Sequence, residues 1–305
     1  ELSDKGHVSE KQLKYYADRT QSGRVGLVVM EHSFVKANGR AITNQLSIAQ
    51  DQDVEGLKTL VKTIHDNGSP MVFQLAHAGA AIREQDVAAE GISPSGLLNP
   101  NPIAGGGQPR GTHAMSLEEI EDIKKHFVAA ALRAKAAGAD GVEIHVAHAY
   151  LLNQFYSPLT NKRTDNYGGS LENRLRIVTE TIDLIRQAIG SDMLVGVRLG
   201  ASDYMPDGND VEEGAKAAKI LEAAGLDYIS ISGGMCGSRH PEKTEAGFFS
   251  DAAEAIKKVV TIPVILTGGI KSAEEANRFL EAQSADLIGV ARAIVANPNW
   301  AQEQV

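Results

Sequence analysis

Three segments of the sequence follow one plan, and this repetition limits the possible folds more than any other feature. Residues 135–144 (KAAGADGVEI), 222–231 (EAAGLDYISI) and 281–290 (EAQSADLIGV) each run from an alanine-rich helix end through a turn to an aspartate and an apolar strand. Glycine at the turn suits the left-handed end of a helix, and serine replaces it in the third copy. We therefore expect a chain built from copies of one helix and strand unit.

Seven apolar runs rich in β-branched residues have the composition of strands that are buried on both faces, as in a parallel sheet. They span residues 25–30, 71–75, 141–146, 193–199, 227–232, 263–269 and 286–291. Capping boxes are predicted to begin three of the helices, at Ser9 with Gln12, Ser116 with Glu119 and Ser272 with Glu275. A helix over about Ser9 to Gln21 precedes the first run, and another is expected to begin near Asn297.

Eight helices for seven strands indicate a (β/α)8 barrel from which the first strand is missing, with an open doubly wound sheet as the alternative. A length of 305 residues suits one such barrel, so we expect a single domain over residues 1–305. The N-terminal strand and a C-terminal tail are then expected to be absent from the sequence. The Gly/Pro-rich segment 99–111 is predicted to be a long loop, either a lid or a wide connection.

The charge and the cysteine content limit the partners of the protein. A formal net charge of −9 disfavours nucleic acid and anionic membranes, which are bound through clustered lysine and arginine. No stretch approaches the roughly 20 apolar residues that span a bilayer. Cys236 is the only cysteine and forms no internal disulfide, which suits a reducing cytosol. We expect a cytoplasmic protein, with a homo-oligomeric state, that binds a small molecule.

Polar residues follow the predicted strands at the end where barrel enzymes carry their active sites. The residues found there are Glu31, His32, Gln74, His77, His145, His148, Arg198, Gly233, Gly234, Gly268, Gly269 and Arg292. Because the carboxyl ends of the strands meet on one face of a barrel, these residues are expected to share one site.

The segment TGGI (267–270) leads into a helix that Ser272 is predicted to cap, and the last predicted strand delivers Arg292 nearby. Glycines let backbone N–H groups approach an anion, and the corresponding loops hold phosphate in many barrels. Gly268 and Gly269 are therefore candidates, with Arg292, for a phosphate site. The alternative is that they only turn the chain.

Arg198 lies in an apolar strand, where an unpaired charge is costly, so it must meet a structural carboxylate or an anionic part of a ligand. If the phosphate belongs to a flavin, a cation beside the ring system stabilises the charge that develops on reduction. Gln74 is then a candidate for the edge of the ring. Its alternative role is to satisfy backbone groups of the loop.

His145, His148 and Tyr150 follow one apolar run, in EIHVAHAYLLNQF (143–155), and three interpretations remain open. With Glu143 the histidines are possible metal ligands, although no further ligand with clear spacing follows. They are also compatible with simple hydrogen bonding at the barrel mouth. In the third interpretation two imidazole N–H groups polarise a carbonyl oxygen and the phenol, with an ordinary pKa near 10, donates a proton. That equipment suits the reduction of an alkene conjugated to a carbonyl.

These segments resemble a known family. Residues 138–176, GADGVEIHVAHAYLLNQFYSPLTNKRTDNYGGSLENRLR, are very similar to the central block of the old yellow enzyme family, the FMN-dependent NADH:flavin oxidoreductases. The similarity continues along the chain through FQLAHAG, VGVRLG, SGGM, LTGGI and GVARAIVANP. The pair of histidines resembles the bacterial branch, since other branches carry asparagine at the second position.

The resemblance implies a role for each matching residue. His145 and His148 are expected to bind the activating oxygen of the substrate and Tyr150 to donate the proton. The residues implied to bind FMN are His32, Gln74, Arg198, Gly268, Gly269, Ala291 and Arg292. The chain departs from the family pattern in lacking the first strand, in Ala80 where arginine is common, and in Ala291 where glycine is common. His32 is a further departure, because a small residue usually touches the flavin edge there.

The expected activity is the transfer of hydride from NAD(P)H through FMN to an activated alkene. The alternatives are a dienoyl-CoA or enoate reductase or an amine dehydrogenase of the same family, a flavin-binding protein without turnover, or a flavin-free aldolase or isomerase. The single cysteine provides no set of ligands for an iron–sulfur cluster.

Overall fold

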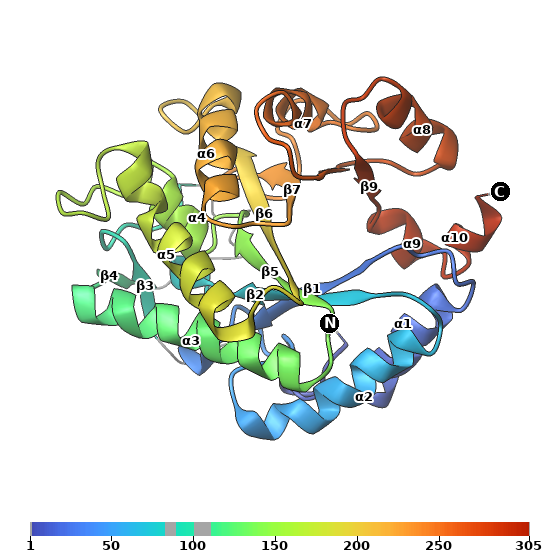
Figure 1. The fold of residues 1–305 in the computed structure, drawn as a ribbon. Coiled ribbons are helices and arrows are strands. Elements are labelled where there is room, and N and C mark those ends of the chain that lie inside the picture. The colour runs from blue at the N-terminus through green and yellow to red at the C-terminus, as the bar shows by residue number, and fades with distance from the viewer. Residues whose placement is uncertain (1, 83–89, 101–110, 305) are drawn as a thin grey trace.

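A computed structural model describes residues 2–82, 90–100 and 111–304 of the protein. Seven parallel strands form one curved sheet in the order β1-β2-β5-β6-β7-β8-β9 (Figure 1). Their bounds are β1 Val28–Phe34, β2 Met71–Ala76, β5 Gly141–Val146, β6 Leu194–Ser202, β7 Tyr228–Gly233, β8 Val264–Thr267 and β9 Leu287–Gly289. All seven predicted strands are confirmed. Within the described residues, no further strand pairs with the outer edge of β1 or of β9.

Helices connect the strands and lie on the outer side of the sheet (Figure 1). They are α1 Glu10–Thr20, α2 Val54–His65, α3 Leu117–Ala136, α4 Leu151–Tyr156, α5 Leu171–Ile189, α6 Val211–Ala223, α7 Ser250–Lys257, α8 Ala273–Glu281, α9 Arg292–Ala296 and α10 Trp300–Glu303. Short 3-10 turns occur at Ala37–Gly39, Asp51–Asp53 and Gly79–Ala81. A small parallel pair, β3 Gly91–Ser93 and β4 Thr112–Ala114, was not predicted. It lies at either end of the predicted loop 99–111, most of which is outside the described residues.

The repeated aspartate has the same structural role in each copy of the unit. Each one stands just before a strand and accepts a hydrogen bond from the first backbone N–H groups of the neighbouring strand. The three bonds run from Met71 to Asp140 at 2.8 Å, from Val195 to Asp227 at 2.7 Å and from Val264 to Asp286 at 2.9 Å. A basic side chain also binds each aspartate, namely His65, Arg186 and Lys257. One carboxylate per unit therefore fixes the register at the amino end of a strand pair.

The first strand differs from its predicted bounds in a way that affects the site. It starts at Val28 and continues to Phe34, whereas the prediction was residues 25–30. The pairing of β1 with β2 shifts between Met30 and Ser33, so two residues of β1 oppose one residue of β2. Such a bulge bends its strand and can change the direction of a side chain. His32 therefore lies within β1, not after it.

The predicted helix starts are confirmed, although only one capping box is reciprocal. Ser9, Ser116 and Ser272 each accept a hydrogen bond from the backbone N–H three residues later. Only Glu119 returns a bond to its own cap, at Ser116. Gln12 instead donates to Glu31, at 2.8 Å. The helix expected near Asn297 is two short helices, α9 and α10, and Arg19 of α1 donates to the carbonyl oxygen of Ile294 in α9.

Gly196 of β6 leaves room for the ring of Tyr228. A Cβ atom at position 196 would lie 2.1 Å from that ring, whereas a Cβ at the exposed Gly26 would meet nothing within 4 Å. We expect Gly196→Ala to lower the free energy of unfolding by about 1–3 kcal/mol, since the ring must move within a packed interior. Gly26→Ala is the control, with a change within about 0.5 kcal/mol. Urea titrations of both variants test this, and equal effects would contradict it.

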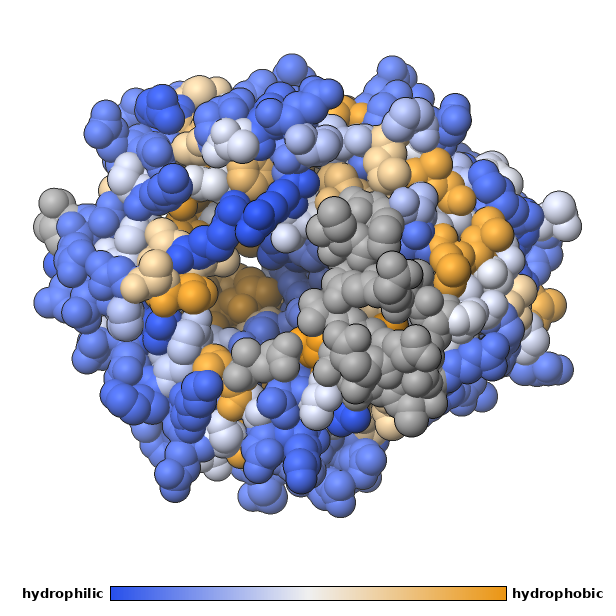
Figure 2. All heavy atoms as spheres, turned by 180° about the vertical axis from the view of Figure 1, so that it is seen from behind, coloured by the Kyte–Doolittle hydropathy of each residue, from blue (hydrophilic) through white to orange (hydrophobic). Residues whose placement is uncertain are grey.

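Figure 2 shows the face opposite to the view of Figure 1. Hydrophilic residues cover most of this face, and its surface is hollowed near the centre with hydrophobic residues in the depth of the hollow. Among the described segments, no helix combines the length and the apolar character that crossing a membrane requires.

Candidate active site

A strained turn brings His145, His148 and Tyr150 together. His145 belongs to β5, and the chain then turns through His148 and Ala149, with φ of 56° and 60°, before α4 begins after Tyr150. Non-glycine residues rarely adopt such angles, and the cost is often found at functional sites. The turn is fixed by hydrogen bonds from His148 N to the carbonyl of Gly233 and from Tyr150 N to the carbonyl of Ala147. Strand alternation alone does not predict this convergence.

The three rings are in contact. The rings of His145 and Tyr150 are stacked with their centres 5.0 Å apart, and those of His145 and His148 meet edge to face at the same distance. Burial holds the pKa of both histidines well below the ordinary value, and nearby cationic and imidazole groups add to this lowering. Both imidazoles are therefore neutral at neutral pH, and each carries one N–H donor.

His32 is a third imidazole in this group. Its ring meets Tyr150 edge to face at 5.3 Å and His145 at 6.2 Å. His32 lies in the bulge of β1. The adjacent Glu31 points to α1, where it accepts hydrogen bonds from Gln12 and Tyr16. The sequence placed His32 near the flavin edge, and that role stays a prediction.

Gln74 and Arg198 flank Glu143 on the neighbouring strands β2 and β6. Gln74 Nε2 donates to Glu143 Oε1 at 2.6 Å, and Glu143 is fully buried. Burial raises the pKa of Glu143, while the Arg198 charge, Gln74 and Tyr228 oppose the rise. The only role expected of Glu143 from the sequence was that of a possible metal ligand. Arg198 was expected to meet either a structural carboxylate or an anionic part of a ligand. Glu143 is such a carboxylate, since burial lowers the pKa of Arg198 and the Glu143 charge opposes this lowering.

Ser232, at the end of β7, was not identified from the sequence. Its Oγ lies 2.7 Å from His148 Nε2 and accepts a hydrogen bond from Arg198 at 3.4 Å. Ser232 thus connects the imidazole pair to Arg198. The signal available in the sequence was its place directly before Gly233 and Gly234, at the carboxyl end of a predicted strand.

Gly268 and Gly269 end β8 with φ of 118° and 74°, in the region that favours glycine. A Cβ atom at Gly268 would lie 2.8 Å from the Phe248 ring, and one at Gly269 would lie 2.9 Å from the carbonyl oxygen of Glu245. The Arg292 guanidinium carbon also lies over the Phe248 ring, 5.6 Å from its centre. The structure therefore gathers the two glycines and Arg292 around Phe248, a residue that the sequence did not single out. Ala291 is exposed at the start of α9.

These residues fit FMN. Arg198 Nε is buried without a hydrogen-bond partner within the described part of the chain, as expected of a group that meets a ligand. At the other end, the positive φ and the closeness of Phe248 and the Glu245 carbonyl require glycine at Gly268 and Gly269. The contacts of Gln74 and Arg198 with a flavin ring, and of Gly268, Gly269 and Arg292 with its phosphate, stay predictions.

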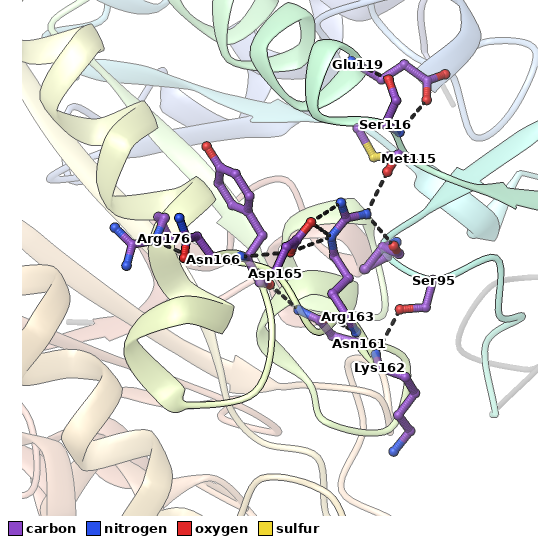
Figure 3. A network of polar contacts seen from close by, with 12 residues as sticks. Ser95, Met115, Ser116, Glu119, Asn161, Lys162, Arg163, Asp165, Asn166 and Arg176 are labelled. Carbon is purple, nitrogen blue, oxygen red and sulfur yellow. Dashed lines mark hydrogen bonds and ion pairs between the residues drawn. The ribbon is translucent and has the colours of Figure 1, made fainter.

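Figure 3 shows a network of polar contacts between the segment after α4 and the residues that follow β3 and β4. Arg163 donates to the carbonyl oxygens of Pro94 and Met115, which follow β3 and β4, at 2.8 and 2.6 Å. Asp165 pairs with the same guanidinium at 2.6 Å. Arg163 therefore joins the chain after β5 to the small sheet. This contact explains part of the family-like block 138–176 to which the sequence alone assigned no role.

The metal interpretation finds no support in the residues that the structure describes, since no three His, Cys, Asp or Glu side chains there are grouped to hold an ion. His77 is separate from the reactive group. Its Nδ1 accepts from the Gly79 backbone at 3.0 Å, and burial lowers its pKa to about 3. Ala80 donates from its backbone N–H to Gln154 of α4 at 3.2 Å.

Comparisons with known proteins agree with this geometry. The sequence profile of the NADH:flavin oxidoreductase / NADH oxidase family matches residues 1–304. The chain is 38% identical over 306 residues to an NADH oxidase of Thermoanaerobacter brockii, with 98% of this chain aligned but only 46% of that protein. It is also 38% identical over 300 residues to an NADPH dehydrogenase of Geobacillus sp. (strain WCH70), covering 98% of this chain and 84% of that protein. The chain thus spans about half the length of the first relative.

Solved structures share the fold. A 2-naphthoyl-CoA reductase in complex with 2-naphthoyl-CoA superposes with a TM-score of 0.89 at 27% identity, covering 98% of this chain and 47% of that chain. The old yellow enzyme homologue from Zymomonas mobilis superposes with a TM-score of 0.82 at 25% identity, covering 98% and 84%. Morphinone reductase in complex with tetrahydroNAD also gives 0.82, at 27% identity, covering 99% and 82%. These similarities confirm the predicted fold class.

Proposed function

Because the chain belongs to the NADH:flavin oxidoreductase / NADH oxidase family, we propose that it reduces an activated alkene with electrons from NAD(P)H. FMN is the cofactor that the family implies, and when bound it supplies the two-electron carrier between the two substrates. In the whole reaction NAD(P)H is oxidised to NAD(P)+, and the carbon–carbon double bond takes up one hydride and one proton. The observation that supports this proposal best is the stacking of Tyr150 on His145, a neutral imidazole whose ring in turn meets that of His148.

The imidazole pair serves the oxygen of the substrate. His145 Nδ1 accepts a hydrogen bond from the Ala147 backbone N–H at 3.4 Å, which leaves the ring proton on Nε2. Ser232 Oγ accepts from Arg198 and lies 2.7 Å from His148 Nε2. We propose that the Ser232 hydroxyl donates to this nitrogen, an arrangement in which the His148 proton is on Nδ1. Two N–H groups at a carbonyl oxygen stabilise the negative charge that develops there during hydride addition.

Tyr150 supplies the proton. Its ring stacks on His145. With the carbonyl oxygen held by His145 in this proposal, the phenol hydrogen is near the carbon–carbon bond conjugated to that carbonyl. The proton passes from Tyr150 Oη to one carbon, and the phenolate regains a proton from water. Gln74 and Arg198 hold the ring of the cofactor, with Gly268, Gly269 and Arg292 at its phosphate. His32 and Ala291 complete the proposed set of residues that contact the cofactor.

Two half-reactions under anaerobic conditions test the proposal. We expect the full-length protein to be yellow, NAD(P)H to bleach the flavin absorption, and cyclohexenone to restore it with formation of cyclohexanone. A protein that is bleached but not restored by any alkene is a flavin reductase of another kind. A colourless protein that does not bind added FMN would contradict the proposal as a whole.

A second substrate class is a conjugated acyl-CoA thioester. The observation that favours it is the TM-score of 0.89 with a 2-naphthoyl-CoA reductase, against 0.82 for the two other solved structures. The carbonyl of a thioester would use the same imidazole pair. Reoxidation of the reduced protein by crotonyl-CoA, compared with cyclohexenone at equal concentration, distinguishes the two classes.

A further inference from the structure

The proposed contact of His32 with the cofactor does not account for its contact with Tyr150. Its ring is in edge-to-face contact with the proposed proton donor Tyr150, at 5.3 Å, and it also meets His145. It lies in the bulge of β1, and the adjacent Glu31 points to α1. A residue in a strand bulge that contacts the proposed proton donor is a candidate for a chemical role, because bulges are frequent next to active sites.

Gln45 fixes the position of the His32 proton. Gln45 is 3% exposed, and its Oε1 accepts from the Ala41 backbone N–H at 2.7 Å. Its Nε2 lies 3.1 Å from the carbonyl oxygen of His32 and 2.7 Å from His32 Nδ1. A backbone N–H only donates and a carbonyl only accepts, so both ends of the amide are assigned without ambiguity. The amide therefore donates to Nδ1, and a neutral His32 must carry its proton on Nε2.

His32 is neutral at physiological pH. Burial, assisted by the Arg198 charge, lowers the pKa of His32 to about 4. The ring thus presents one N–H donor, on the side away from Gln45. The Tyr150 and His145 rings are its aromatic neighbours.

On the basis of the proposed function, we propose that His32 is a positioning residue for Tyr150, whose Nε2–H is directed at the phenol oxygen by Gln45. When Tyr150 gives its proton to the alkene carbon, the Tyr150 O–H bond breaks and the electron pair stays on the oxygen as a phenolate. A hydrogen bond to a charged oxygen is stronger than one to a neutral hydroxyl, so His32 favours the step that creates the phenolate. Water then returns the proton.

The tautomer is measured independently of catalysis. In protein labelled with 15N-histidine, the protonated and unprotonated ring nitrogens of neutral imidazole have separate NMR shifts. We expect His32 to show the Nε2-protonated form, with its signals assigned among the nine histidines by their loss in His32→Asn. In Gln45→Glu the new carboxylate accepts from the ring, so the proton should move to Nδ1. An Nδ1-protonated His32 in the wild-type protein would overturn the proposal.

The kinetic test is a double-mutant cycle on the alkene-reduction step. Loss of one hydrogen bond to a charged oxygen predicts a decrease of about 10- to 100-fold in that step for His32→Asn, with a similar change for Gln45→Glu. In the Tyr150→Phe background His32→Asn should have no further effect, because no phenolate forms. His126→Asn, a histidine beside Asp122 on α3, is the matched control and should retain the wild-type rate.

The outcomes separate the two proposals. If the wild-type protein reduces no alkene, the proposed function fails and the role of His32 in proton transfer fails with it. If the wild-type protein turns over normally and His32→Asn keeps its rate, only the role of His32 fails. Equal slowing by His32→Asn in the presence and absence of the Tyr150 hydroxyl would show a structural effect and would also refute the proposal.

Discussion

Tyr150→Phe is expected to slow the alkene-reduction step by about 10²- to 10⁴-fold, while the reduction of FMN by NAD(P)H stays within about twofold of the wild-type rate. The change removes the hydroxyl and keeps the ring that stacks on His145. Only the second half-reaction needs a proton at carbon, so only that step should lose its general acid. Stopped-flow absorption measurements follow the two half-reactions separately.

The control for Tyr150→Phe is Tyr204→Phe. Tyr204 also donates from its hydroxyl, to Asp251 at 3.1 Å, but it packs against His240 and Phe249 and not against the imidazole pair. We expect no selective loss in this control. A Tyr150→Phe variant that is slowed equally in both half-reactions would contradict the role of proton donor, because an equal loss indicates disturbed cofactor binding.

Arg198→Met is expected to lower the free energy of unfolding at neutral pH by on the order of 2 kcal/mol or more, because it leaves the buried Glu143 carboxylate without the cation that acts on it. The double variant Arg198→Met/Glu143→Gln removes the buried charge and should recover more than half of the loss. Urea unfolding in the presence of excess FMN measures both. A double variant as unstable as the single one would indicate that Arg198 acts on the cofactor alone.

The same variant should show a changed pH dependence. The folded-state pKa of Glu143 is raised by burial, and removal of Arg198 raises it further. A carboxyl group with a raised folded-state pKa contributes most favourably below its unfolded value of about 4.3, and this contribution is lost as the pH rises through the folded value. Arg198→Met should therefore be closest to the wild-type stability in mildly acidic buffer. A loss of stability that does not vary with pH would contradict this account.

The repeated units made the strands and helix starts predictable, whereas the geometry of the site depends on local backbone departures. Buried parallel strands have a continuous apolar signal, and the capping residues mark the helices, so these elements follow from residue type alone. The positive φ values at His148 and Ala149 and the bulge beside His32 leave no such pattern. They decide which way side chains point, which is why the prediction could name His145, His148 and Tyr150 but not their contacts.

The contacts that other segments of the chain make with the site residues could not be predicted from the sequence either. Gln45 reaches His32 from a loop between β1 and α2, Ser232 reaches His148 from β7, and Phe248 lies between the glycines of β8 and Arg292. Gln45 and Phe248 belong to no motif named from the sequence, and Ser232 is the first residue of SGGM, to which no role was assigned. Each became visible only when the sheet order set neighbouring strands side by side.

The aspartates that precede β5, β7 and β9 bind neighbouring strands at the amino ends of the sheet, opposite to the ends that carry the candidate site. Since Asp140, Asp227 and Asp286 fix the register of neighbouring strands, the loops at the carboxyl ends are not needed to align the sheet. A loop such as the one carrying His148 can then store torsional strain, or exchange its residues for others, without letting a strand slip. The loops at the carboxyl ends of the strands can therefore change, and substrate specificity with them, while the turns at the amino ends stay the same.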